Sequence, residues 1–161
     1  MNISRDEFIA ELTATRSIEE VAALAMRDLE SLPQPVTMVC GRLTTGGGHF
    51  EENRRVMRKA ISFLRRQRRE TVFDQLLYLG RIDRLPDARR QLRFPFFRNY
   101  FRRHRRKIMR EKLHLVLLGS GLIQKIVFLP GWHLSEGSWW YHDRAIELGI
   151  KIDYLKEKDL A

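Results

Sequence analysis

Cysteine and long apolar runs are nearly absent from this sequence of 161 residues. Its single cysteine, Cys40, cannot form an internal disulfide, which suits a reducing compartment. No run of about 18 apolar residues, the length that crosses a bilayer, is present. Residues 1–7 have neither the basic flank nor the apolar core of a secretion signal. We therefore expect a cytoplasmic protein that does not span a membrane.

The patterns that mark metal and cofactor sites are also missing. The five histidines show no ligand spacing with one another or with Cys40, which argues against a zinc site. The glycine-rich stretch 44–48 is not followed by the Gly-Lys-Ser/Thr of a P-loop, and it lacks the spacing of the dinucleotide-binding fingerprint. We expect no metal and no cofactor.

Acidic residues are scarce in the middle of the chain. Residues 54–112 contain 21 Lys and Arg against 5 Asp and Glu, a local charge of +16, while the whole chain carries +10. Such a density attracts phosphates, on a nucleotide, a nucleic acid or a phosphorylated partner. The alternative is that these arginines are solvated, or pair with acidic surfaces of another subunit.

The apolar periodicity predicts alternating helices and strands. Two patterns typical of helix capping boxes, at Ser4 and Ser17, open the first two helices. The expected helices lie at 5–12, 18–31, 51–67, 75–85, 96–118 and 138–148. The expected strands lie at 36–40, 71–73, 125–129 and 150–154.

This alternation predicts an α/β fold with a mainly parallel sheet and helices on both faces. We expect one domain over 1–161, in which a helical pair at 1–34 precedes the α/β part. Two loops rich in small residues, 41–50 and 130–138, follow strands and precede helices. They should converge at the carboxyl ends of the strands, where such sheets bind ligands.

The glycines of the first loop and Cys40 before it each allow two interpretations. The glycines at 46–48 let the backbone approach a ligand closely, or they form a flexible turn. Cys40 is better explained as a small buried hydrophobe than as a nucleophile, because no base lies near it in the sequence.

Two stretches together resemble the nucleoside 2-deoxyribosyltransferase superfamily, most closely its small uncharacterised members. The first runs from Val39 through Gly41, Arg42 and the glycines into Phe50-Glu51-Glu52-Asn53. The second is Leu129-Pro130-Gly131-Trp132, followed by the Ser-x-Gly of 135–137. The resemblance spans about residues 36–154.

The resemblance implies a flavodoxin-like or Rossmann-like sheet of about four to five strands that binds a nucleoside or nucleotide. In this superfamily a glutamate on the helix after the Ser-x-Gly loop attacks the anomeric carbon, so that the N-glycosidic bond is cleaved or transferred. The resemblance also implies a homo-oligomer, and contact of Arg42 with a phosphate. The substrate-binding residues that it implies are Gly41, Arg42, Thr45, Gly46, Gly47, Trp132, Ser135, Gly137 and Ser138.

The sequence departs from this pattern at the nucleophile. Tyr141 occupies the position where the glutamate is expected, and a phenol with a pKa near 10 needs an adjacent base to attack. Glu136 and Asp143 are the nearby carboxylates, but Asp143 lies about 200° from Tyr141 around an ideal helix. The candidate catalytic residues are therefore Tyr141, Glu136 and Asp143.

Three functions remain open from the sequence. The first is cleavage or transfer of the N-glycosidic bond of a nucleoside 5′-phosphate. The second is a nucleotide sensor with a degenerate catalytic site. The third is nucleic-acid binding through the basic region 54–112.

Overall fold

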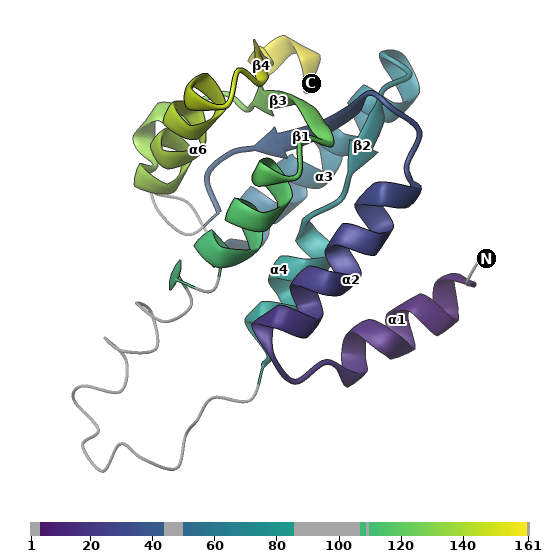
Figure 1. Cartoon of the computed structure of the whole chain (residues 1–161). Helices are drawn as coiled ribbons and strands as arrows, with labels where there is room; N and C mark the ends of the chain where they lie inside the picture. The colour runs from purple at the N-terminus through teal and green to yellow at the C-terminus, as the bar shows by residue number, and fades with distance from the viewer. Residues whose placement is uncertain (1–3, 44–49, 86–106, 109, 161) are drawn as a thin grey trace. The chain divides into compact units, whose positions relative to one another are not determined.

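The structure is a computed structural model of the chain, and it describes residues 4–43, 50–85, 107–108 and 110–160 (Figure 1). The chain divides into two compact units. One unit comprises Met1–Asp28 and Gln75–Leu117, and the other comprises Leu29–Asp74 and Leu118–Ala161.

The unit of 29–74 and 118–161 contains a sheet of four parallel strands in the order β2-β1-β3-β4. The strands are β1 (Val36–Cys40), β2 (Thr71–Phe73), β3 (Ile123–Phe128) and β4 (Lys151–Tyr154). Flavodoxin-like sheets have this order in their first four strands. The prediction of an α/β fold with a parallel sheet is confirmed.

The strands β1 and β3 form the centre of the sheet. Every residue of β1 is buried, and the last three residues of β3 are buried as well. Cys40 and Phe128 are paired in register at the ends of the two strands, and the Leu129 N–H donates to the Cys40 carbonyl over 2.8 Å. The carboxyl ends of β1 and β3 therefore lie side by side.

Helices flank this sheet. The helix α3 (Phe50–Gln67) packs on β1 and β2, and α6 (Glu136–Glu147) packs on β4. The apolar stripe of α3 is buried at Met57, Ala60, Ile61 and Leu64. Two short 3₁₀ helices, η1 (Trp132–Leu134) and η2 (Glu157–Asp159), follow β3 and β4.

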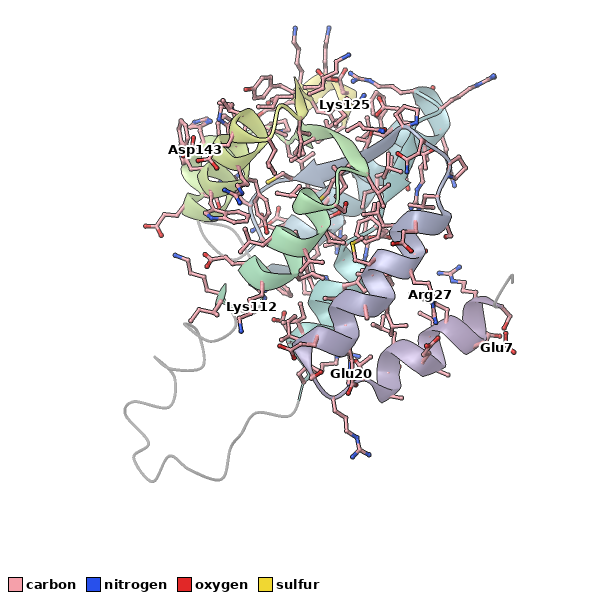
Figure 2. The ribbon with its side chains drawn as sticks, in the orientation of Figure 1. Glu7, Glu20, Arg27, Lys112, Lys125 and Asp143 are labelled. Atoms are coloured by element: carbon pink, nitrogen blue, oxygen red, sulfur yellow. The ribbon has the colours of Figure 1, made fainter. Side chains whose placement is uncertain are left out.

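An ionic cluster lies near the amino-terminal ends of the strands. Glu70 accepts a hydrogen bond from the Thr37 hydroxyl over 2.7 Å, and its carboxylate lies 2.6 Å from the Lys125 ammonium (Figure 2). Because both charged side chains are mostly buried, losing one partner would leave the other charge poorly compensated. The cluster therefore joins residues of β1 and β3 and the residue that precedes β2.

The other unit is helical where it is described. It contains α1 (Arg5–Ala14), most of α2 (Ile18–Ser31), α4 (Leu76–Ile82) and helical residues at 107–108 and 110–117. The capping box predicted at Ser4 is confirmed, because the Ser4 hydroxyl accepts the Glu7 N–H and the Glu7 carboxylate accepts the Ser4 N–H.

Tyr78 anchors the packing of α1, α2 and α4. Its side chain is fully buried, its ring lies edge-on to Phe8 with centroids 6.1 Å apart, and its hydroxyl donates to Asp28 over 2.7 Å. Arg81 of α4 donates from its guanidinium to the hydroxyl and carbonyl of Thr15, just after α1. These hydrogen bonds satisfy polar groups that the packing would otherwise bury without partners.

His114 is a buried titratable group in the same unit. Its Nδ1 lies 2.7 Å from the Arg110 carbonyl, to which it donates. Burial lowers the pKa of His114 to about 4, although the hydrogen bond to the carbonyl opposes this shift. The folded protein therefore holds a neutral ring where the unfolded chain, with a pKa near 6.5, takes up a proton.

This difference predicts a pH-dependent loss of stability. Between pH values of about 6.5 and about 4 the unfolded state binds the extra proton, so stability falls as the pH falls through this window. The cost is about 3 kcal/mol. Chemical denaturation of the native protein and of His114→Leu at neutral and acidic pH measures it. From neutral to acidic pH, the free energy of unfolding of the variant should fall by about 3 kcal/mol less than that of the native protein. An identical pH dependence of stability in the two proteins would contradict the prediction.

Candidate functional site

The site is built where β1 and β3 end. Arg42 lies two residues beyond β1, and its guanidinium lies over Gly131, the third residue beyond β3. A Cβ added to Gly131 would lie 3.3 Å from Arg42 Nη2, and Gly131 has a φ of 73°, which disfavours any side chain. Gly131 therefore allows Arg42 to reach across from one strand end to the other.

Gly41 makes the second close approach. A Cβ at this position would lie 2.7 Å from Cδ1 of Leu129, a distance at which atoms must move apart. Leu129 is itself buried, so its side chain has little room to move. The ends of β1 and β3 are thus joined by the Leu129–Cys40 backbone hydrogen bond and by close packing of the Leu129 side chain against Gly41.

We expect Gly41→Ala to destabilise the protein by about 1–3 kcal/mol, the cost of overpacking a filled interior. Urea denaturation measures the change. Gly119→Ala is the matched control, because a Cβ there meets no atom within 4 Å. Equal stability of Gly41→Ala and the native protein would contradict the close approach.

The amino terminus of α6 follows directly. Ser135 is its N-cap, and the Ser135 hydroxyl accepts the Ser138 N–H over 3.4 Å. Glu136 and Gly137 are the first two helical residues and are exposed. Backbone amides at the start of a helix, together with its dipole, favour an anion.

Cys40 and Ser138 meet beneath this helix terminus. Burial raises the pKa of the Cys40 thiol to about 12, although the Ser138 hydroxyl beside it lowers it. Apart from this thiol, a weak partner, the buried Ser138 Oγ has no hydrogen-bond partner. Cys40 remains a neutral thiol at physiological pH and acts as a small apolar residue, as its place in the sequence suggested.

Aromatic rings surround the end of β3. The indole of Trp132 stacks on the His142 ring at 4.7 Å with an interplanar angle of 12°. His142 Nε2 lies 2.9 Å from the Tyr154 hydroxyl. The Phe128 ring lies against the Trp132 and His142 rings, with centroid distances of 4.9 and 5.4 Å. Trp139 adds a further ring, 4.9 Å from Trp132.

The aromatic cluster of Phe128, Trp132, Trp139, His142 and Tyr154 was not predicted from the sequence. The register between β3 and β4 pairs Phe128 with Tyr154, and η1 then brings Trp132 next to α6. The concentration of aromatic residues at 128–141 was the one signal that could have indicated it.

The three candidate catalytic residues all lie on α6. Tyr141 is half-buried, and its ring is edge-on to Trp140 with centroids 4.9 Å apart. Glu136 is exposed in the first turn, and the side chain of Asp143 is 71% exposed (Figure 2). Neither carboxylate lies in a buried environment.

Part of the predicted site lies outside the described residues, namely Thr45, Gly46 and Gly47. The last described residue before them, Leu43, accepts a hydrogen bond through its carbonyl from Asn53 Nδ2 over 3.3 Å. The first turn of α3 is thereby hydrogen-bonded to the segment that follows β1. Of the predicted binding residues, Gly41 lies against Leu129 and Arg42 over Gly131, while Trp132 lies in η1 and Ser135, Gly137 and Ser138 lie at the start of α6.

Among the described residues, no group of three or more His, Cys, Asp or Glu side chains could hold a metal ion. No helix in the described part of the chain is long and apolar enough to cross a membrane. The chain matches no family model, no curated protein and no solved structure.

Proposed function

We propose that the protein binds a nucleoside phosphate at the carboxyl ends of β1 and β3 without cleaving it. The observation that carries this proposal is the guanidinium of Arg42 over Gly131, in the loop that leads through η1 to the start of α6. The switch point of a flavodoxin-like strand order lies between β1 and β3, where such sheets bind ligands.

The phosphate is the part of the ligand with the clearest partners. Arg42 offers a planar fork of donors that matches phosphate oxygens. The amides of Glu136 and Gly137 at the start of α6 add the positive end of a helix dipole. An arginine and a helix amino terminus together favour a phosphate over a neutral sugar.

The base has an aromatic partner nearby. Trp139 is 47% exposed, and its indole is held in place because its Nε1 donates to the His133 carbonyl over 2.8 Å. A fixed, exposed indole is a stacking surface for a nucleobase, and its orientation costs little entropy on binding. Stacking accepts any base, so we expect weak discrimination among bases.

Cleavage of the glycosidic bond is not part of the proposal. A tyrosine stands where the resemblance requires a glutamate, and the exposed carboxylates of Glu136 and Asp143 have no buried environment. A phenol at position 141 needs a base to become a nucleophile. The sensor alternative is therefore favoured over the glycosidase or transferase.

The test is a thermal-shift titration with nucleosides and with nucleoside mono-, di- and triphosphates at low and moderate salt. A phosphate-bearing ligand at about 100 times its Kd adds about 2.7 kcal/mol, a shift of roughly 5–10 °C. The corresponding nucleoside should give a smaller shift. Equal shifts with every polyanion, lost at moderate salt, would contradict a specific nucleotide site.

Chromatography of the same mixtures decides between binding and cleavage. We expect the nucleotide to be recovered intact after incubation with the native protein. Release of free base would show that the protein cleaves the glycosidic bond, and would contradict the binding-only proposal.

A further inference from the structure

The outer face of α3 carries cations that no residue in the described part of the chain neutralises. Each of these side chains is exposed, and none has a hydrogen bond or an ion pair with any residue in the described part of the chain. We call this set the basic face of α3. It consists of Arg55, Arg58, Lys59 and Arg66 on the helix and Arg69 just beyond its end.

The neighbouring cations differ, because each has a partner. Arg54 pairs with Glu51 at 3.3 Å, and Arg68 pairs with Asp153 at 2.7 Å. Arg65 donates to the Val72 carbonyl over 2.7 Å. The basic face is therefore a selected part of the arginine-rich sequence, separate from the arginines that hold the fold together.

The spacing of the basic face follows the helix. Positions 55, 58, 59 and 66 recur at steps of three, four and seven residues on the side opposite the buried stripe. From Arg55 to Arg66 the rise is about 16.5 Å along the helix. About 16.5 Å of duplex axis carries about 10 phosphate charges, so a duplex can offer a phosphate to each of these cations.

We propose that the basic face of α3 binds the phosphate backbone of a nucleic-acid duplex, without reading its sequence. The face has no exposed apolar side chain to insert into a bilayer, since the other exposed residues of α3 are Glu51, Glu52, Ser62, Arg65 and Gln67. Five exposed cations, none of which pairs with a described residue, match a regular line of phosphates better than the scattered carboxylates of a protein surface. The inference does not rest on nucleotide binding by Arg42.

Arg69 adds a second, independent observation. It follows the carboxyl end of α3 with a φ of 52°, a left-handed conformation that glycine adopts far more easily. The Glu70 N–H then donates back to the Leu64 carbonyl over 3.1 Å, which closes the helix end. The sequence has an exposed cation where the backbone favours glycine, which is expected if the charge is used.

The experiment is fluorescence anisotropy of a labelled DNA duplex of random sequence, titrated with the full chain between about 50 and about 200 mM salt. The test variant is Arg58→Gln/Lys59→Gln. The matched control is Arg5→Gln/Arg16→Gln, which removes the same charge from exposed positions in and beside α1.

Loss of two phosphate contacts should lower the slope of log affinity against log salt by about 1.8. The loss of affinity across this salt range then becomes about 12-fold smaller for the test variant than for the native protein. The control should keep the native slope. Equal changes in both variants, or no binding of the native protein at about 50 mM salt, would overturn the proposal.

A second variant separates binding from folding. Arg69→Gly removes a charge and relieves the left-handed backbone, so its melting temperature should equal or exceed the native value while its salt slope falls by about 0.9. An unchanged slope would remove Arg69 from the interface. Tighter binding of the native protein to phosphatidylserine vesicles or to polyglutamate than to the duplex would overturn the assignment to nucleic acid.

Discussion

Replacing Arg42 with alanine is expected to weaken nucleotide binding on the order of 10- to 100-fold. The reason is that charge-assisted hydrogen bonds contribute about 1.5–3 kcal/mol each, and Arg42 is the cation placed over Gly131 at the strand ends. Isothermal titration calorimetry with the nucleotide that gives the largest thermal shift measures the change.

Arg42→Lys is the informative companion. It keeps the charge but loses the planar fork, so its affinity should fall between those of the alanine variant and the native protein. The melting temperature of each variant without ligand shows whether the fold is intact. Native affinity in Arg42→Ala, with an unchanged melting temperature, would contradict the role of Arg42.

Phe128→Ala is expected to destabilise the protein by about 3–5 kcal/mol, the largest effect on folding that we predict. Phe128 is fully buried at the end of a central strand. Its ring contacts Trp132, His142 and Tyr154, with centroid distances of 4.9, 5.4 and 5.9 Å. Its removal would leave a cavity beneath the remaining rings of the aromatic cluster.

Urea denaturation followed by circular dichroism measures this change. The control is Ile146→Ala on α6, where the side chain is 61% exposed and truncation should cost no more than about 0.5 kcal/mol. Similar losses in the two variants would contradict the central place of Phe128 in the core. Weaker nucleotide binding by folded Phe128→Leu would link the cluster to the site.

The strands were the most predictable part of the fold. The runs at 36–40 and 71–73 were predicted with the bounds that the structure has, because short β-prone runs were flanked by Pro35, Gly41 and polar residues. The strand β3 begins at Ile123, two residues earlier than predicted. Its pairing with β1 extends to Ile123 and Val36, a tertiary contact that the local sequence does not contain.

The helix α6 shows what local reasoning missed. The sequence predicted a helix from 138, because the small residues before it are typical of a loop. The helix begins at Glu136, because the Ser135 side chain caps its first turn. This cap stabilises the turn although it contains Gly137. The predicted end was close, and Gly149 has the left-handed φ of 66° expected after a helix.

The site could be predicted in outline only. Its place at the strand ends followed from the alternation of strands and helices, but the approach of Arg42 to Gly131 depends on the register between β1 and β3. The helix predicted at 96–118 lies partly outside the described residues, and 110–118 is helical. The helices α1 and α4 belong to the same unit and contact each other although more than sixty residues separate them in the sequence. Nothing in the local sequence of either helix indicates this contact.

The central claim is that a nucleotide binds where β1 and β3 end. The most direct test is a titration of isotope-labelled protein with the best nucleotide, followed by amide chemical shifts. We predict that the largest shifts occur at Arg42, Gly131, Glu136 and Gly137, and that Trp139 shifts through its indole N–H. Shifts confined to the exposed face of α3 or to residues of α1 would contradict the claim.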